Sequence, residues 1–100
     1  MIKVLLERCV QREKYDQLLG LIKDLRAAAL HQPGYMMGET LVSENDVVKV
    51  LVISTWVSEE HWKAFLTTEE RVELEGIVDS ILEEEVKVSV YRIPNGYGEK

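Results

Sequence analysis

The stretch VVKVLVISTWVSEEHWKAFL, residues 47–66, decides the fold of this chain. Its first half is apolar and rich in β-branched residues, with a single lysine, which is typical of a strand that is buried on both faces. Ser58 is a suitable N-cap, and the two glutamates after it place negative charge in the first helical turn, where the helix dipole favours it. The stretch therefore predicts a buried strand over residues 47–57 and, directly after it, a short helix over residues 59–66.

Trp56 lies where the predicted strand ends. Ligands of open α/β sheets bind just beyond the ends of strands, so Trp56 is the first candidate for a functional residue. The structural alternative is an anchor in the core or in a dimer interface, because a buried indole removes roughly 150–250 Å² of surface from water. The helix that follows carries Trp62, Phe65 and Leu66 at helical spacing and is expected to pack them onto the sheet.

The rest of the chain follows the same two hydrophobic periodicities. Alternation of apolar and polar residues predicts a strand, and apolar residues at i, i+3, i+4 and i+7 predict a helix. The predicted elements are strands over residues 2–10, 35–43, 47–57 and 86–93, helices over residues 12–32 and 59–66, and a further helix that restarts at Thr67 and carries apolar residues as far as Leu82. Pro33-Gly34 ends the first helix.

The order of these elements is β-α-β-β-α-β, with the second helix in two pieces. This order predicts an α+β fold of the ferredoxin-like type, a four-stranded antiparallel sheet that carries its helices on one face. We expect a single domain over residues 1–94 and a polar tail over residues 95–100.

Composition excludes several kinds of partner. The net charge of −6 disfavours nucleic acid, whose phosphates require clustered Lys and Arg, and it disfavours an anionic membrane surface. Cys9 is the only cysteine, which rules out an internal disulfide and fits a reducing cytoplasm. With no signal peptide and no membrane-spanning apolar run, we expect a cytoplasmic protein that binds neither nucleic acid nor membrane.

Cofactor motifs are absent from the sequence. It has no Gly-rich phosphate loop and no dinucleotide fingerprint, and its two histidines and one cysteine lack metal-site spacing. We therefore expect no cofactor and no metal.

Helices on one face of a sheet leave the other face open. We assign the alternating aliphatic residues of the first and last strands to the helix side: Ile2, Val4, Leu6, Val86, Val88 and Val90. The open face then receives Leu5, Glu7, Cys9, Ser89, Tyr91 and Ile93. This mixture is too apolar to lie in water and too polar for an ordinary core. It predicts a small-molecule cavity closed by the sheet of a second copy, and therefore a homodimer.

Three motifs carry a resemblance to a known family. Pro33-Gly34-Tyr35, Thr55-Trp56 and Ser58-Glu59-Glu60 before a helix resemble the antibiotic biosynthesis monooxygenase domain, over about residues 2–93. That family is part of the dimeric α/β-barrel group, which includes haem-degrading enzymes and cofactor-independent, quinone-forming oxygenases. The resemblance implies a homodimeric barrel in which each subunit keeps a pocket between sheet and helices.

The chain departs from the family pattern at several positions. Family members often carry a histidine where this chain has Phe65, and sometimes another near Glu70. The Asn, Trp and His of the haem-degrading branch would fall near the end of the first strand, at Phe65 and at Glu75. None of the three is present, which disfavours haem degradation.

Candidate catalytic residues are Glu7 and His61. The first and last strands should be neighbours, so Glu7 and Tyr91 on one face could act as base and hydrogen-bond donor. A buried carboxyl group has a raised pKa, and histidine titrates in a range suited to proton transfer. The structural alternatives are a rim carboxylate and a solvated histidine. Arg8, at the end of its strand, and the glutamates between residues 69 and 85 are expected in solvent.

Candidate substrate-binding residues are the aromatic side chains Trp56, Tyr91, Phe65 and Tyr35. Oxygen chemistry without a cofactor needs an electron-rich substrate that forms a carbanion and reduces O₂ itself, in a dry cavity with a base and orienting donors. The leading hypothesis is a cofactor-independent monooxygenase-like domain, acting on a small aromatic or quinol-type substrate in a cavity between sheet and helices. The alternative is a non-catalytic, dimeric small-ligand-binding protein of the same fold.

Overall fold

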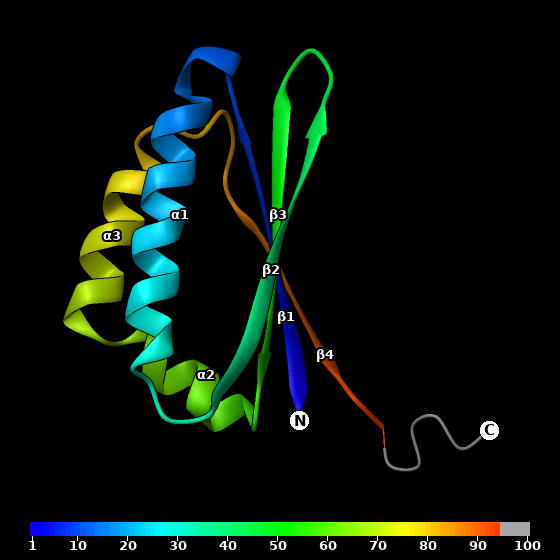
Figure 1. Ribbon diagram of the computed structural model, residues 1–100, viewed down its shortest axis with the longest axis vertical. Helices are drawn as coiled ribbons and strands as arrows, with labels where there is room; N and C mark the ends of the chain where they lie inside the picture. The colour runs from blue at the N-terminus through cyan, green and yellow to red at the C-terminus, as the bar shows by residue number, and fades with distance from the viewer. Residues whose placement is uncertain (95–100) are drawn as a thin grey trace.

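Four antiparallel strands form one sheet in the order β2-β3-β1-β4, with three α-helices on one of its faces (Figure 1). The computed structural model describes residues 1–94, and the predicted polar tail, residues 95–100, lies outside the described residues. The elements are β1 (Ile2–Val10), a 3-10 turn (Arg12–Lys14), α1 (Tyr15–Leu30), β2 (Tyr35–Glu44), β3 (Val48–Trp56), α2 (Glu59–Leu66), α3 (Glu69–Asp79) and β4 (Lys87–Arg92). The predicted α+β, ferredoxin-like fold is confirmed. In the described part of the chain, no helix has the length and apolar character that a membrane crossing requires.

Alternation along β1 orients the sheet. Its even-numbered residues, Ile2, Val4, Leu6, Arg8 and Val10, are all buried, and its odd-numbered residues are partly exposed. The apolar even-numbered ones pack against the helices: Ile2, Val4 and Leu6 belong to a core cluster around Trp56, and Val10 to a second cluster around Leu18. The helix side of the sheet is therefore the side on which the core lies.

The open face of the sheet has an apolar centre that is not fully covered. Leu5, Leu51 and Ile53 are partly buried there, whereas Leu41 is 50% and Tyr91 59% exposed. β3 was predicted to be buried on both faces, and this is wrong for the single chain. On the open face Lys49 is exposed, Leu51 and Ile53 are partly exposed and Thr55 is buried, because no described element of the same chain covers that face.

Strand β4 has the predicted orientation but not the predicted burial. Val90 pairs with Val4 and Val88 with Leu6, which places these valines on the helix side. They are nevertheless 42% and 52% exposed, because β4 is the edge strand and diverges from the helix layer (Figure 1).

The second helical segment restarts one residue later than predicted. Thr68, not Thr67, is the N-cap of α3, and its hydroxyl accepts a hydrogen bond of 3.4 Å from the Arg71 N–H. The helix ends at Asp79, before the acidic run at residues 83–85, whose charge is unfavourable at a helix C-terminus. The Glu83 N–H then donates to the Cys9 carbonyl at 2.8 Å, which ties this segment to the end of β1.

Gly34 holds the turn between α1 and β2 against the start of α2. Its φ is 86°, and a Cβ at this position would lie 2.3 Å from Cγ of His61. We expect Gly34→Ala to lower the free energy of unfolding by about 1–3 kcal/mol, measured by urea denaturation. Gly20→Ala is the matched control, because Gly20 is helical and has open space around it. That control should stabilise the protein by about 0.5–1 kcal/mol, and equal effects at the two glycines would contradict the prediction.

Candidate functional site

A cavity of about 50 Å³ lies between the sheet and the helices. Its aromatic wall consists of Tyr35, Trp56, Trp62 and Phe65, and its charged side chains are Arg8, Arg26, Arg71 and Glu75. Arg8 comes from β1, and Tyr35 is the first residue of β2. Arg71 and Glu75 lie one turn apart on α3. The cavity therefore combines an apolar, flat-sided wall with a group of fixed charges.

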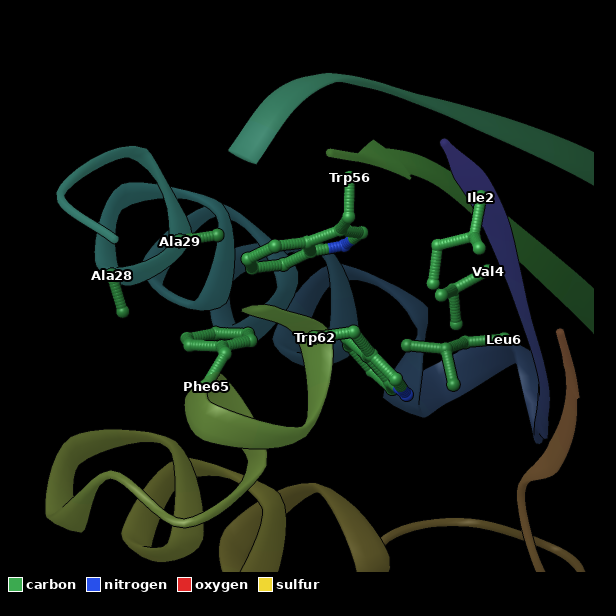
Figure 2. Packing of buried hydrophobic residues seen from close by; sticks show 8 residues of the cluster. All are labelled: Ile2, Val4, Leu6, Ala28, Ala29, Trp56, Trp62 and Phe65. Carbon is green, nitrogen blue, oxygen red and sulfur yellow. The ribbon is translucent and has the colours of Figure 1, made fainter. Parts of the chain in front are cut away.

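The aromatic wall is organised around Trp56. Its ring stacks on Phe65 with centroids 5.3 Å apart, and it meets Tyr35 edge-on at 5.3 Å and Trp62 at 5.7 Å. Figure 2 shows the rings of Trp56 and Phe65 facing each other beside the aliphatic residues of β1. Trp56 is only 1% exposed, and its indole N–H donates to the Ser54 hydroxyl at 3.0 Å. It is thus both a core anchor and part of the cavity wall.

The charged group is a buried ion cluster. Nη2 of Arg8 and Nη2 of Arg71 both donate to Oε2 of Glu75, at 2.7 and 2.8 Å. Arg8 is 1% exposed, and the guanidinium of Arg71 lies 5.5 Å from the centroid of the Trp62 ring. Two positive charges and one negative charge leave this side of the cavity with a net positive charge.

Burial also shifts the pKa of Arg71. Desolvation lowers the pKa of its guanidinium below the ordinary arginine value, the neighbouring Arg8 acts in the same direction, and Glu75 opposes both. A guanidinium is not deprotonated in proteins, so Arg71 remains a cation.

Tyr35 and Arg26 meet at Gly38 on β2. A Cβ on Gly38 would lie 2.6 Å from the Tyr35 hydroxyl, and Arg26 donates a hydrogen bond to the Gly38 carbonyl. Gly38 is therefore a position where two side chains approach the backbone closely. A bulge lies before it, between Tyr35 and Met37.

Three of the predicted site residues line the cavity, and three do not. Trp56, Tyr35 and Phe65 belong to its aromatic wall. Glu7 and Tyr91 lie on the open face, opposite Lys87 and Lys3 in the β1–β4 pairing, so they are four residue pairs apart. Glu7 forms an ion pair of 3.3 Å with Lys49 there, and Tyr91 is 59% exposed. The structure does not bring Glu7, Tyr91 and Trp56 into one cavity.

His61 lies in the first turn of α2, outside the cavity lining. Its Nδ1 is 2.7 Å from the hydroxyl of Ser58, and its backbone N–H donates to the same oxygen at 3.3 Å. Ser58 is therefore the predicted N-cap. A hydrogen bond from the backbone N–H of Glu60 and one from Ser58 lower the pKa of the Glu60 carboxyl. His61 takes part in this capping arrangement and packs against Gly34.

Arg8 and Glu75 are the functional candidates that the sequence did not identify. Both were expected in solvent, and both are buried, at 1% and 9% exposure, so that expectation was wrong. Two signals pointed to them. Alternation along β1 puts Arg8 in line with Val4 and Leu6, and Glu75 lies one helical turn before the buried Val78. Each charge is tolerated inside because the other neutralises it.

Among residues 1–94, no three or more His, Cys, Asp or Glu side chains gather closely enough to hold a metal ion.

Comparisons place this arrangement among known folds. Rv0793 from Mycobacterium tuberculosis superposes with a TM-score of 0.83 at 12% identity, over 94% of this chain and 95% of that one. An antibiotic biosynthesis monooxygenase of known crystal structure gives 0.82 at 18% identity, over 92% and 97%. SnoaB, a cofactor-independent oxygenase from Streptomyces nogalater, gives 0.79 at 10% identity, over 94% of each chain. At such identities these likenesses establish the fold alone.

Comparison with curated proteins gives no match to this sequence. Comparison with family models, in contrast, shows more than the fold. The family model described as "Antibiotic biosynthesis monooxygenase" matches residues 1–74, which include β1, β2, β3 and the aromatic wall of the cavity. This confirms the family that the motifs suggested. The chain belongs to the antibiotic biosynthesis monooxygenase family.

Proposed function

We propose that this protein is a cofactor-independent monooxygenase that oxidises a small aromatic or quinol-type substrate in the cavity between sheet and helices. The observation that carries the proposal is an aromatic wall beside a buried charged group, in a member of the antibiotic biosynthesis monooxygenase family. SnoaB, which has the same fold, is described as a cofactor-independent oxygenase, and this supports the proposal.

The proposed reaction uses the substrate as the reductant. The ring hydroxyl loses its proton, the resulting phenolate passes one electron to O₂, and the radical pair combines at a ring carbon that bears hydrogen, ortho or para to that oxygen, into a hydroperoxide. Loss of water then leaves a carbonyl group, so one oxygen atom enters the product and the other leaves as water. The protein has to exclude bulk water, accept a proton and stabilise developing negative charge. Trp56, Tyr35 and Phe65 would hold the ring, and Arg8 and Arg71 would supply the positive charge.

The size of the cavity limits the substrate. Ligand sites of globular proteins usually enclose roughly 300–1,000 Å³, and this cavity has about 50 Å³. Arg26 is exposed, and the side chain of Arg71 is 15% exposed, so movement of these two long side chains is the simplest way to enlarge it. We therefore favour a substrate with one compact ring over a large polycyclic one.

A non-catalytic ligand-binding protein is the second candidate. The tight packing around Trp56 favours it, because a cavity of this size is closer to a filled core than to an open active site. Both candidate proteins would bind the ligand, but only the monooxygenase would convert it into a product.

Oxygen uptake tests the proposal. Protein treated with a chelator would be mixed with a set of monocyclic hydroquinones and activated phenols, and O₂ consumption followed with an electrode. We expect consumption above the rate of autoxidation in buffer, and one atom of oxygen from ¹⁸O₂ in the product by mass spectrometry. Binding without added O₂ consumption would overturn the oxygenase and leave the ligand-binding protein.

We also propose that the protein is a homodimer that buries the open face. Leu51 and Ile53 at the centre of that face are partly exposed in the single chain, and Glu7 and Tyr91 would then lie at the interface. Sedimentation velocity should give twice the chain mass for the wild type. Leu51→Arg should give monomers, because it places an unpaired charge in the apolar centre of the interface, while Val72→Arg on α3 should remain dimeric. A wild-type monomer would contradict this proposal.

A further inference from the structure

Two residues that line the cavity each have a buried polar atom without a partner in the described part of the protein. Within the described residues, Nε of Arg8 and Oε1 of Glu75 are buried without a hydrogen bond. Both residues line the cavity, and Arg8 is 1% exposed, so bulk water does not satisfy its Nε–H. Buried polar groups are paired in the great majority of cases, and each unpaired one requires an explanation. A bound group that fills this position is the explanation we pursue.

The pairing of the ion cluster determines what such a group must be. Arg8 and Arg71 both donate to Oε2 of Glu75, at 2.7 and 2.8 Å, so the second carboxylate oxygen remains as an acceptor. The Nε–H of Arg8 remains as a donor. One donor and one acceptor of the same ion pair are thus available, and a hydroxyl group complements both, because it accepts through its oxygen and donates its proton.

Other ligand groups fit less well. A carboxylate accepts from Arg8 but has no proton for Glu75, and it brings a second negative charge to a carboxylate. An ammonium group donates to Glu75 but cannot accept from Arg8 and adds to the positive charge of the two arginines. A methyl group does neither. Of these four groups, only the neutral hydroxyl complements both atoms.

The wall beside these atoms indicates what carries the hydroxyl. Trp62 and Phe65 line the same cavity, with the guanidinium of Arg71 held 5.5 and 5.9 Å from their ring centroids. An aromatic ring fits such a wall, and the small free volume favours a single ring. We propose that Arg8 and Glu75 together bind one ring hydroxyl of a compact phenol or hydroquinone and so determine the specificity of the cavity. This inference rests on the proposed function and deepens it.

The same contact gives Glu75 a place in the reaction. The ring hydroxyl donates to Oε1 of Glu75 and accepts from Nε–H of Arg8. When it ionises, its proton passes from the ring oxygen to Oε1, and the negative charge on the ring oxygen faces the guanidinium of Arg8. Neither Glu7 nor His61 lines this cavity, which makes Glu75 the carboxylate closest to such a substrate.

A comparison of three ligands on the wild-type protein is the first test. Phenol, toluene and benzoate share the ring and differ in the group that would face Arg8 and Glu75. Their dissociation constants can be measured under nitrogen from the fluorescence of Trp56 and Trp62. We expect phenol to bind about 10- to 100-fold more tightly than toluene, the range for hydrogen bonds to charged groups, and more tightly than benzoate. Toluene equal to phenol would mean that the pair is purely structural, and benzoate tighter than phenol would mean an anion site. Either result overturns the inference.

A conservative variant is the second test. Glu75→Gln keeps the shape of the side chain and removes its charge, and we expect it to reduce the preference for phenol over toluene about tenfold. Glu59→Gln is the matched control, because Glu59 is also an ion-paired glutamate on a helix, but on the surface beside Lys63. Its preference should be unchanged. If Glu75→Gln does not fold, the three-ligand comparison decides alone.

The outcomes also separate this inference from the proposed function. A preference for phenol without any O₂ consumption would leave the hydroxyl site standing and overturn the oxygenase. O₂ consumption without a preference for phenol would leave the oxygenase standing and overturn the roles of Arg8 and Glu75.

Discussion

Glu75→Leu is expected to lower the free energy of unfolding by about 3–5 kcal/mol, the usual cost of leaving one member of a buried ion pair without its partner. Arg8 is 1% exposed, and its only side-chain hydrogen bond within residues 1–94 is the one of 2.7 Å to Glu75. Removal of the carboxylate also leaves Arg71 facing Arg8 without a charge between them. Urea denaturation at a fixed protein concentration would measure the loss, because a dimer's stability depends on concentration.

A double variant separates the charge from the packing. Arg8→Met combined with Glu75→Leu removes both buried charges and keeps apolar volume, so it should recover most of the lost stability. The surface pair of Glu59 and Lys63, with its atoms 3.7 Å apart, provides the control. Glu59→Leu should cost less than about 1 kcal/mol, because water and salt screen an exposed pair. A loss at Glu75 as small as that at Glu59 would contradict the burial of the cluster.

Trp56→Ala is expected to lower the free energy of unfolding by about 3–5 kcal/mol, as truncations of large buried aromatic residues do. Trp56 is 1% exposed, and three aromatic rings contact it at centroid distances of 5.3 to 5.7 Å. The loss of the indole leaves a cavity beside Phe65 and leaves the Ser54 hydroxyl without its donor. Thermal and urea unfolding would both report the change.

Two further variants make the result specific to the indole. Trp56→Phe keeps an aromatic ring and should cost less than Trp56→Ala, because a smaller void remains. Val72→Ala on α3 removes an apolar side chain that is 58% exposed, and it should change stability by no more than about 0.5 kcal/mol. A cost for Trp56→Ala near that of Val72→Ala would mean that Trp56 does not anchor the core.

The fold could be predicted from the sequence because its signals are local. Residues 47–66 show a strand, an N-cap and a helix in immediate succession, and the structure has β3, Ser58 and α2 at those positions. The error in the start of α3 is equally local. Thr67 and Thr68 are both acceptable caps, and the helix begins after the second because its hydroxyl reaches the Arg71 N–H.

The candidate site could be predicted only in part. Trp56 and Phe65 were found because strand ends and helical stripes identify large residues that face a sheet. Glu7 was placed correctly on the open face, but the cavity lies on the other side, where Arg8 is buried. A shift of one residue along a strand moves a side chain to the opposite face, so neighbouring residues have unrelated environments.

The elements, their order, the ferredoxin-like fold and the residues of each strand that share a face follow from the sequence alone, because hydrophobic period and capping act over a few residues. The meeting of Arg8 with Glu75, 67 positions away along the chain, and the two atoms of this pair without a partner come from tertiary packing. That contact depends on the rotation of α3 about its axis and on its distance from β1. Packing of the whole core sets both, and no local pattern records them.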